Sequence, residues 1–139
     1  MRAWLALMRS HAALTRRLDA DLVALHGLTL NDYDVLVQLA FAPEQRLRMS
    51  DLADRILLTR SGMTRRVDRL QRSGLVIRRS CESDARGAFA ELTEAGAETL
   101  AAARSGHLQT VRKLFTGRLV EEELREIARL LEPIAADAP

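Results

Sequence analysis

The chain has 139 residues and a formal net charge of only +2. This length fits one domain with a hydrophobic core of its own. The charge is unevenly distributed, because residues 46–86 contain eleven arginines and five acidic residues, a local balance of +6 that leaves −4 for the rest. A basic middle between acidic flanks predicts one surface that meets a polyanion.

Cysteine usage and the first residues exclude several classes of protein. Cys81 is the only cysteine, which excludes a disulfide framework and a thiolate metal cluster and fits a reducing cytoplasm. The start, MRAWLALMRSHAALTRRLDADL, has an apolar run too short for a membrane span and lacks a small-residue cleavage site. The common catalytic and phosphate-binding motifs are missing, and the acidic run 121–123 fits a solvated helix start. We therefore expect a cytoplasmic protein that is not an enzyme and needs no metal or cofactor.

The N-terminal third predicts two helices. Apolar residues recur at helical spacing over residues 2–25, and Gly27 is placed to end that helix. Either Thr29 or Asn31 caps the next helix, which ends before the loop at Pro43. Leu47 and Met49, just beyond that loop, are expected to add a short third strand to the hairpin.

The central stretch, residues 49–93, predicts a helix, a turn and a second helix. Ser50 is an expected N-cap of the first helix, and Thr59 of the second. Met63, Val67 and Leu70 fall on one face of the second helix and are expected to pack inward. The opposite face is polar and rich in arginine, and it carries Arg60, Ser61, Thr64, Arg65, Asp68, Arg69 and Arg72.

A hairpin is predicted after the second helix. Gly74 stands where a helix needs a residue with positive φ to stop. Two β-prone runs, residues 75–77 and 89–92, flank a polar segment with a turn glycine at Gly87. Two short helices followed by a basic hairpin predict a winged helix-turn-helix, a fold that reads DNA.

Two further helices are expected at the C-terminal end. Thr93 caps a helix reaching about residue 115, in which Gly96 and Gly106 are expected to allow close helix–helix approach. A last helix over residues 120–134 is ended or kinked by Pro133. The flanking helices are amphipathic, so a second copy of the chain is the expected partner of their apolar faces. The alternative is that they cover the chain's own core.

The polar face of the second central helix suits base recognition. Arg60, Ser61, Thr64 and Arg65 lie in its first two turns, the part of a recognition helix that reaches base edges. Arginine forms bidentate pairs with guanine, and hydroxyl groups can donate to bases or phosphates. Further along the helix, Arg69 is expected to meet phosphates, as is Arg72. At the hairpin tip, Asp84 can hold Arg86 extended toward a minor groove by a charge-assisted bond.

These motifs resemble the MarR family of bacterial transcriptional regulators. The resemblance runs through MSDLADRI, TRSGMTRRVDRLQRSGLVIRR, the D-x-R-G of the hairpin and LTEAG, and more loosely through both flanks. It implies a mainly helical fold with a small β-hairpin wing. The DNA-binding part, here called the reader, would span residues 29–92, and the dimerisation helices would span residues 1–27 and 93–139. It also implies a homodimer on a palindromic operator, usually a repressor, with contacts at Arg60, Ser61, Thr64, Arg65 and Arg86. A small aromatic or phenolic effector commonly releases the DNA in this family.

The resemblance leaves the effector and the wing open. The family's ligand cleft lies between reader and dimer helices, where the candidates are Trp4, His11, Tyr33 and His107, with Arg16 or Arg17 for a carboxylate. Many relatives have a polar residue in place of Ala85, which lowers the expected wing affinity. Cys81 is not where peroxide-sensing relatives place their cysteine, so a thiol switch at this position is a separate hypothesis. The alternative function is a protein-interaction module that has the winged fold but no longer binds DNA.

Overall fold

The computed structural model describes residues 1–136 except residue 57 and residues 82–83; the side chains of residues 81–87 are also outside the description. Its elements in chain order are α1 (Arg2–His26), α2 (Leu30–Ala40), η1 (Pro43–Gln45), β1 (Arg46–Arg48), α3 (Met49–Ile56), α4 (Arg60–Arg72), β2 (Val76–Cys81), β3 (Asp84–Leu92), α5 (Glu94–Leu114), η2 (Thr116–Arg118) and α6 (Glu121–Ala136). The predicted mainly helical winged helix-turn-helix is confirmed.

Local chemistry accounts for most helix boundaries. Gly27 ends α1 with φ 65°, a left-handed conformation that favours glycine. The choice of cap for α2 is settled, since Thr29 accepts from the Asp32 amide while the Asp32 carboxylate accepts from the Thr29 amide, a capping box. Thr59 caps α4, and Thr93 caps α5, as expected.

Two expectations about boundaries and glycines are wrong, and a third is narrowed. Ser50 is not the N-cap of α3, because that helix already begins at Met49 and the Ser50 hydroxyl donates to Asp51. Of the two expectations for Pro133, the ending of the helix is excluded, because Pro133 lies inside α6, which continues to Ala136; the kink stays a prediction. Gly96 does allow a close approach, but a Cβ there would meet the Leu75 carbonyl oxygen at 2.2 Å, so its neighbour is the start of the hairpin and not a helix.

The wing is part of a three-stranded antiparallel sheet in the order β1-β3-β2. β1 adds the third strand expected at Leu47, which lies opposite Ala90 of β3. Met49, expected in the same strand, instead begins α3. On the other side Val76 of β2 lies opposite Leu92. Leu47, Val76, Ala90 and Leu92 are buried, so one face of the sheet packs on the helices and the other faces solvent.

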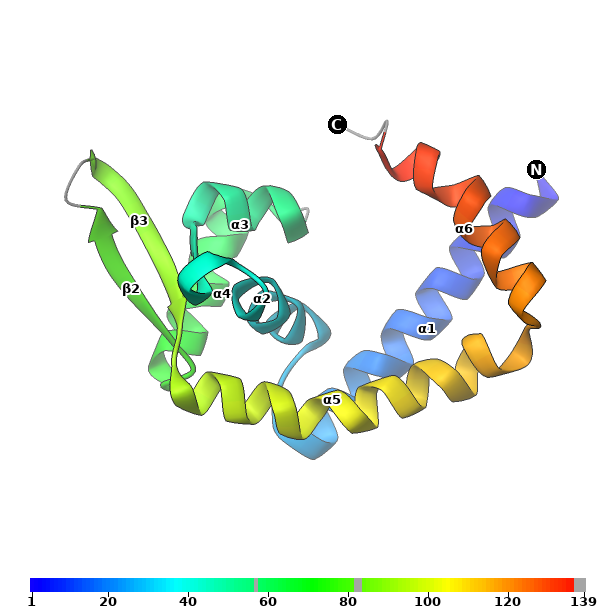
Figure 1. The fold of residues 1–139 in the computed structure, drawn as a ribbon, viewed down its shortest axis with the longest axis horizontal. Coiled ribbons are helices and arrows are strands. Elements are labelled where there is room, and N and C mark those ends of the chain that lie inside the picture. Colours follow the sequence, from blue (N-terminus) through cyan, green and yellow to red (C-terminus); the bar gives the residue numbers. More distant parts are fainter. Residues whose placement is uncertain (57, 82–83, 137–139) are drawn as a thin grey trace.

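The helices surround one apolar core beneath the sheet. Leu36 and Leu39 of α2, Leu52 of α3 and Met63 of α4 are each fully buried in it. In Figure 1 the reader, made of α2, α3, α4 and the sheet, lies at one end of α5, and α1 and α6 lie toward the other end. No residue of α6 is buried by the described part of this chain. That helix therefore does not cover the chain's own core.

Candidate nucleic-acid interface

The polar face of α4 is presented to solvent by an apolar seam behind it. Met63 and Val67 are 0% exposed and Leu70 is 2% exposed, so they hold the helix against the core. On the opposite side Arg60, Ser61 and Arg65 are exposed, and Thr64 is half-buried. The structure thus brings all four expected base-reading residues to one surface, in the first two turns of the helix.

These four side chains differ in whether they already have a partner within the chain. Arg60 and Arg65 form no ion pair with the described residues, which leaves their guanidinium groups available to an external anion. Thr64 Oγ1 donates to the Arg60 carbonyl oxygen at 3.0 Å, and Ser61 Oγ lies 3.3 Å from Thr59 Oγ1. The two hydroxyls are therefore oriented by local bonds before any ligand arrives.

Arg69 has a partner that sequence analysis missed. Its guanidinium forms an ion pair with the buried carboxylate of Asp32 on α2 and donates to Thr29 Oγ1 at 3.3 Å. Arg66, one turn earlier, donates to the same carboxylate at 3.1 Å. The side chain expected to meet phosphate is thus held at the back of the helix in this structure, and its phosphate contact stays a prediction.

The wing is tied to α4 by a second ion pair. Arg78 of β2 donates to the Asp68 carboxylate at 2.7 Å, and Arg79 donates to Glu91 of β3 at 2.6 Å. Asp68, expected simply to face solvent, therefore fixes the hairpin beside the helix. Asp84 begins β3. The Asp84–Arg86 bond and the state of Cys81 depend on side chains outside the described set.

The solvent face of the sheet adds further positive charge to that of α4. The guanidinium carbons of Arg46 and Arg48 lie 5.5 and 5.2 Å from the Phe89 ring centre. These are cation–π distances. Arg46 also forms an ion pair with Glu44. Arg46 and Arg48 thus add cationic groups on the sheet to those of α4, as a surface that meets a polyanion would require.

The candidate effector residues do not form one site. Trp4 is 58% exposed near the N-terminus of α1. His11 lines a groove of about 710 Å³ between α1 and α2, together with Arg16 and Asp34. Tyr33 does not line that groove; it stacks on His107 of α5, with ring centres 4.4 Å apart.

Burial changes the ionisation of this small cluster. Burial raises the pKa of the Tyr33 hydroxyl. It also raises the pKa of the Asp34 carboxyl, although the nearby His107 acts to lower that pKa. It also lowers the pKa of His107, although the nearby Asp34 carboxylate opposes this. His107 Nδ1 is buried without a hydrogen-bond partner among the described atoms. The α2–α5 contact is therefore built to hold a neutral imidazole.

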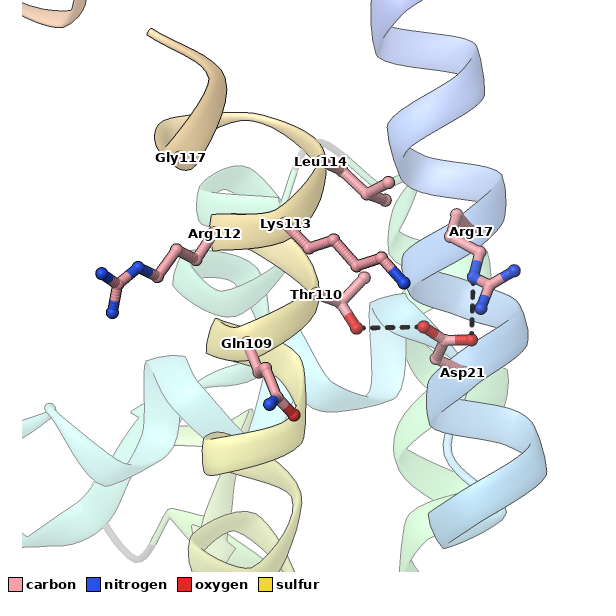
Figure 2. Close-up of a pocket in the computed structure, with 8 residues that line it drawn as sticks. All are labelled: Arg17, Asp21, Gln109, Thr110, Arg112, Lys113, Leu114 and Gly117. Atoms are coloured by element: carbon pink, nitrogen blue, oxygen red, sulfur yellow. Dashed lines mark hydrogen bonds and ion pairs between the residues drawn. The ribbon is translucent and has the colours of Figure 1, made fainter. Parts of the chain in front are cut away.

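A second cavity, of about 700 Å³, lies between α1 and α5. Figure 2 shows the Lys113 side chain extending from α5 toward α1, while Arg112 points away. Arg17 pairs with Asp21 at 3.0 Å, and Thr110 Oγ1 donates to the same carboxylate at 3.0 Å. Arg17, which was a candidate to bind the carboxylate of a ligand, thus already pairs with Asp21 of the same helix. Its neighbour Arg16 faces the other groove.

The described residues offer little for other kinds of site. They contain no group of three or more histidine, cysteine, aspartate or glutamate side chains that could hold a metal ion. None of the described helices is both long enough and apolar enough to cross a membrane.

A capped helix with an arginine and hydroxyl face, packed beside a basic hairpin, defines a winged helix-turn-helix DNA-binding protein. Comparison with known proteins gives the family. A family model described as MarR family matches residues 26–87. AbsC of Streptomyces coelicolor, a MarR family transcriptional regulator, is 40% identical, with a TM-score of 0.91 over 96% of this chain and 90% of its own. The chain belongs to the MarR family and is a transcriptional regulator.

Two other relatives cover nearly the whole chain. Sco3205 of the same organism, a MarR family regulator solved in complex with DNA, is 35% identical, with a TM-score of 0.94 over 99% of this chain and 87% of its own. MhqR of Bacillus subtilis, an HTH-type transcriptional regulator, is 26% identical over 99% of this chain and 92% of its own length. The expected family and fold are therefore confirmed.

Proposed function

We propose that this chain represses transcription by binding a palindromic operator as a homodimer, with one α4 in the major groove of each half-site. The observation that carries the proposal is the exposed face of Arg60, Ser61 and Arg65, which a buried apolar seam and the Thr59 cap hold in place. Sco3205, which shares this fold at 35% identity, was solved in complex with DNA. That relationship supports duplex DNA as the polyanion.

The side chains take different parts in the proposed complex. Arg60 and Arg65 pair with guanine O6 and N7, the commonest specific contact of arginine in the major groove. Ser61 and Thr64 contact phosphate or a base edge, and Thr64 also offers a methyl group to thymine. In the wing, Arg86 enters the neighbouring minor groove, where A·T-rich sequences have the most negative potential.

The dimer is supported by apolar side chains that this chain leaves uncovered. They lie on the first half of α1, just before α6 and on α6, away from the reader in Figure 1, and they are Trp4, Leu5, Leu7, Met8, Val120, Leu130 and Ile134. Large exposed apolar side chains gathered on neighbouring elements mark interaction surfaces. A two-fold pair joined there carries two copies of α4, which suits an operator with half-sites about one DNA turn apart.

An effector that is a small aromatic or phenolic acid is the second part of the proposal. The groove between α1 and α2 offers His11 and Arg16, close to the capped start of α2. A carboxylate bound to Arg16 would act on α2, and α2 contacts the recognition helix through Asp32. Benzoate and phenol serve as probes. Raised thermal stability and loss of DNA binding that both disappear in Arg16→Ala would support this site, and unchanged values in the wild type would remove it.

A salt titration of DNA binding tests the main proposal. For each phosphate that a cationic group neutralises, log K falls by about 0.9 per unit of log[salt], so affinity should fall steeply. Arg65→Ala should weaken binding by about 1–3 kcal/mol if it reads a guanine. Arg125→Ala is the matched control, because Arg125 is an exposed arginine on α6 paired only with Glu121 among the described residues. A flat salt response, or equal affinities of the two variants, would refute the assignment.

A reporter assay distinguishes repression from activation. With the selected operator placed between promoter and reporter, expression should fall when the protein is supplied, and the fall should be smaller with Arg65→Ala. An increase in expression would show an activator.

A further inference from the structure

A fully buried carboxylate joins the recognition helix to α2. Asp32 is 0% exposed. Its oxygens accept from the Thr29 amide at 2.8 Å, from Arg66 at 3.1 Å, and from the Arg69 guanidinium. Thr29 Oγ1 accepts in turn from Arg66 at 2.8 Å and from Arg69 at 3.3 Å. Two arginines one turn apart on α4 thus converge on one acidic residue and its cap.

This network constrains α4 in a way that its apolar seam does not. Burial of Met63, Val67 and Leu70 decides which side of the helix faces inward, but hydrophobic contact is not directional. Charge-assisted bonds from arginine to a carboxylate are directional and fix both distance and orientation. Because they hold two successive turns of α4, they oppose rotation of the helix about its axis and sliding along α2.

The network lies next to the base-reading residues. Arg66 follows Arg65 in the chain, and Arg69 is one turn beyond Arg65 on the same helix. Base recognition needs side chains within about 0.5 Å of their productive positions. The Arg66 side chain is 21% exposed, and its Nε is buried without a partner among the described atoms. A desolvated guanidinium of this kind depends strongly on its remaining acceptors, Thr29 Oγ1 and the Asp32 carboxylate, of which only Asp32 carries a charge.

We infer that Asp32 is a positioning residue for DNA recognition. It aligns α4 for base contacts and at the same time withholds two cationic groups from general attraction to phosphates. The inference rests on the proposed function. It predicts an asymmetric effect: loss of the carboxylate should weaken binding to the operator while leaving binding to unrelated duplex unchanged or tighter.

The test compares Asp32→Asn with the wild-type protein on the operator selected from random duplexes and on a scrambled duplex. Asparagine has nearly the same shape but no charge. We expect the ratio of operator affinity to scrambled-duplex affinity to fall about tenfold, the size of one lost base contact. On the scrambled duplex the slope of log K against log[salt] should steepen, by up to about 2 if both released arginines reach phosphates.

Two other variants separate this role from a change of charge or a loss of folding. Asp54→Asn on α3 removes the same charge from an exposed position and should leave the affinity ratio unchanged. Arg66→Lys keeps the cation but removes the planar fork, and it should lower the ratio without changing scrambled-duplex binding. It also provides the test if Asp32→Asn does not fold, as judged by circular dichroism.

The outcomes distinguish the inference from the proposed function. A wild-type protein with no preference for any duplex would overturn both. Normal operator preference in the wild type together with an unchanged ratio in folded Asp32→Asn, or in Arg66→Lys where Asp32→Asn is unfolded, would overturn the positioning role alone. An equal loss on both duplexes would also overturn it, because a merely structural defect lowers the amount of active protein.

Discussion

Two glycines of α5 give opposite predictions for the same substitution. Gly96 is buried in the first turn, where its amide donates to Thr93 Oγ1 at 3.0 Å. Gly106 lies in the middle of the helix, and a Cβ there meets nothing within 4 Å. A Cβ at Gly96 would lie 2.2 Å from the Leu75 carbonyl oxygen and 2.8 Å from Leu92 Cδ1. Gly96→Ala and Gly106→Ala therefore make a matched pair within one helix.

The magnitudes follow from packing and helix propensity. Alanine in place of glycine stabilises a helix interior by about 1 kcal/mol, which is the expected gain at Gly106. At Gly96 the same gain is smaller than the cost of overpacking against a backbone atom, about 1–3 kcal/mol, because a carbonyl cannot rotate away as a side chain can. The start of α5 has to move away from β2, so we expect Gly96→Ala to lose about 1–2 kcal/mol in net stability.

Thermal unfolding at a fixed protomer concentration measures both effects, since the proposed dimerisation would make the midpoint depend on concentration. For a chain of this size 1 kcal/mol shifts Tm by about 3 °C. Gly96→Ala should therefore lower Tm by about 3–6 °C, and Gly106→Ala should raise it by about 3 °C. Equal shifts of the same sign would refute this prediction, because helix propensity alone would then account for both substitutions and the contact at Gly96 would have no cost.

Three further predictions concern the Thr59 cap, the half-buried His107 and the proposed dimer. Thr59→Ala removes the bond to the Gly62 amide and should cost about 1 kcal/mol in urea unfolding; no loss would contradict its capping role. Burial lowers the pKa of His107, so the stability it contributes is full above its unfolded value of about 6.5 and is lost as pH falls through the folded value. Wild-type Tm should therefore drop more than that of His107→Asn as the pH falls below about 6.5, and parallel pH curves would contradict this. Ile134→Asp on the exposed face of α6 should convert the dimer to monomer in sedimentation, and an unchanged mass would exclude that face.

The fold was predictable from local patterns because the reader depends on them. The spacing of Met63, Val67 and Leu70 identifies the inward face of α4, and the threonines at 59 and 93 identify helix starts. The prediction that Ser50 caps α3 failed because β1 is followed directly by α3. The helix therefore begins at Met49, one residue before the expected cap. The spacing of apolar residues does not show that a strand ends at Arg48, immediately before the helix.

The network around Asp32 could not be predicted in the same way. Asp32 and Arg66 are separated by 34 positions, and nothing in either local pattern marks them as partners. The one available signal was T-x-x-D at Thr29, which indicates a capping box but not that the capping carboxylate also receives two arginines. Arg69 was predicted to be an exposed cation because its partner Asp32 is also far away in the sequence. The stacking of Tyr33 on His107 likewise depends on how α2 meets α5.

Selection of bound sequences from a random pool of duplexes is the most direct test of the central claim that α4, presented twice, reads DNA. The account predicts enrichment of an inverted repeat whose half-site centres lie about one helical turn apart or a multiple of it. The same selection with Arg65→Ala should relax the preference at one symmetric pair of positions. A bound pool with the same sequence composition as the input, for the wild-type protein at low salt, would contradict the account.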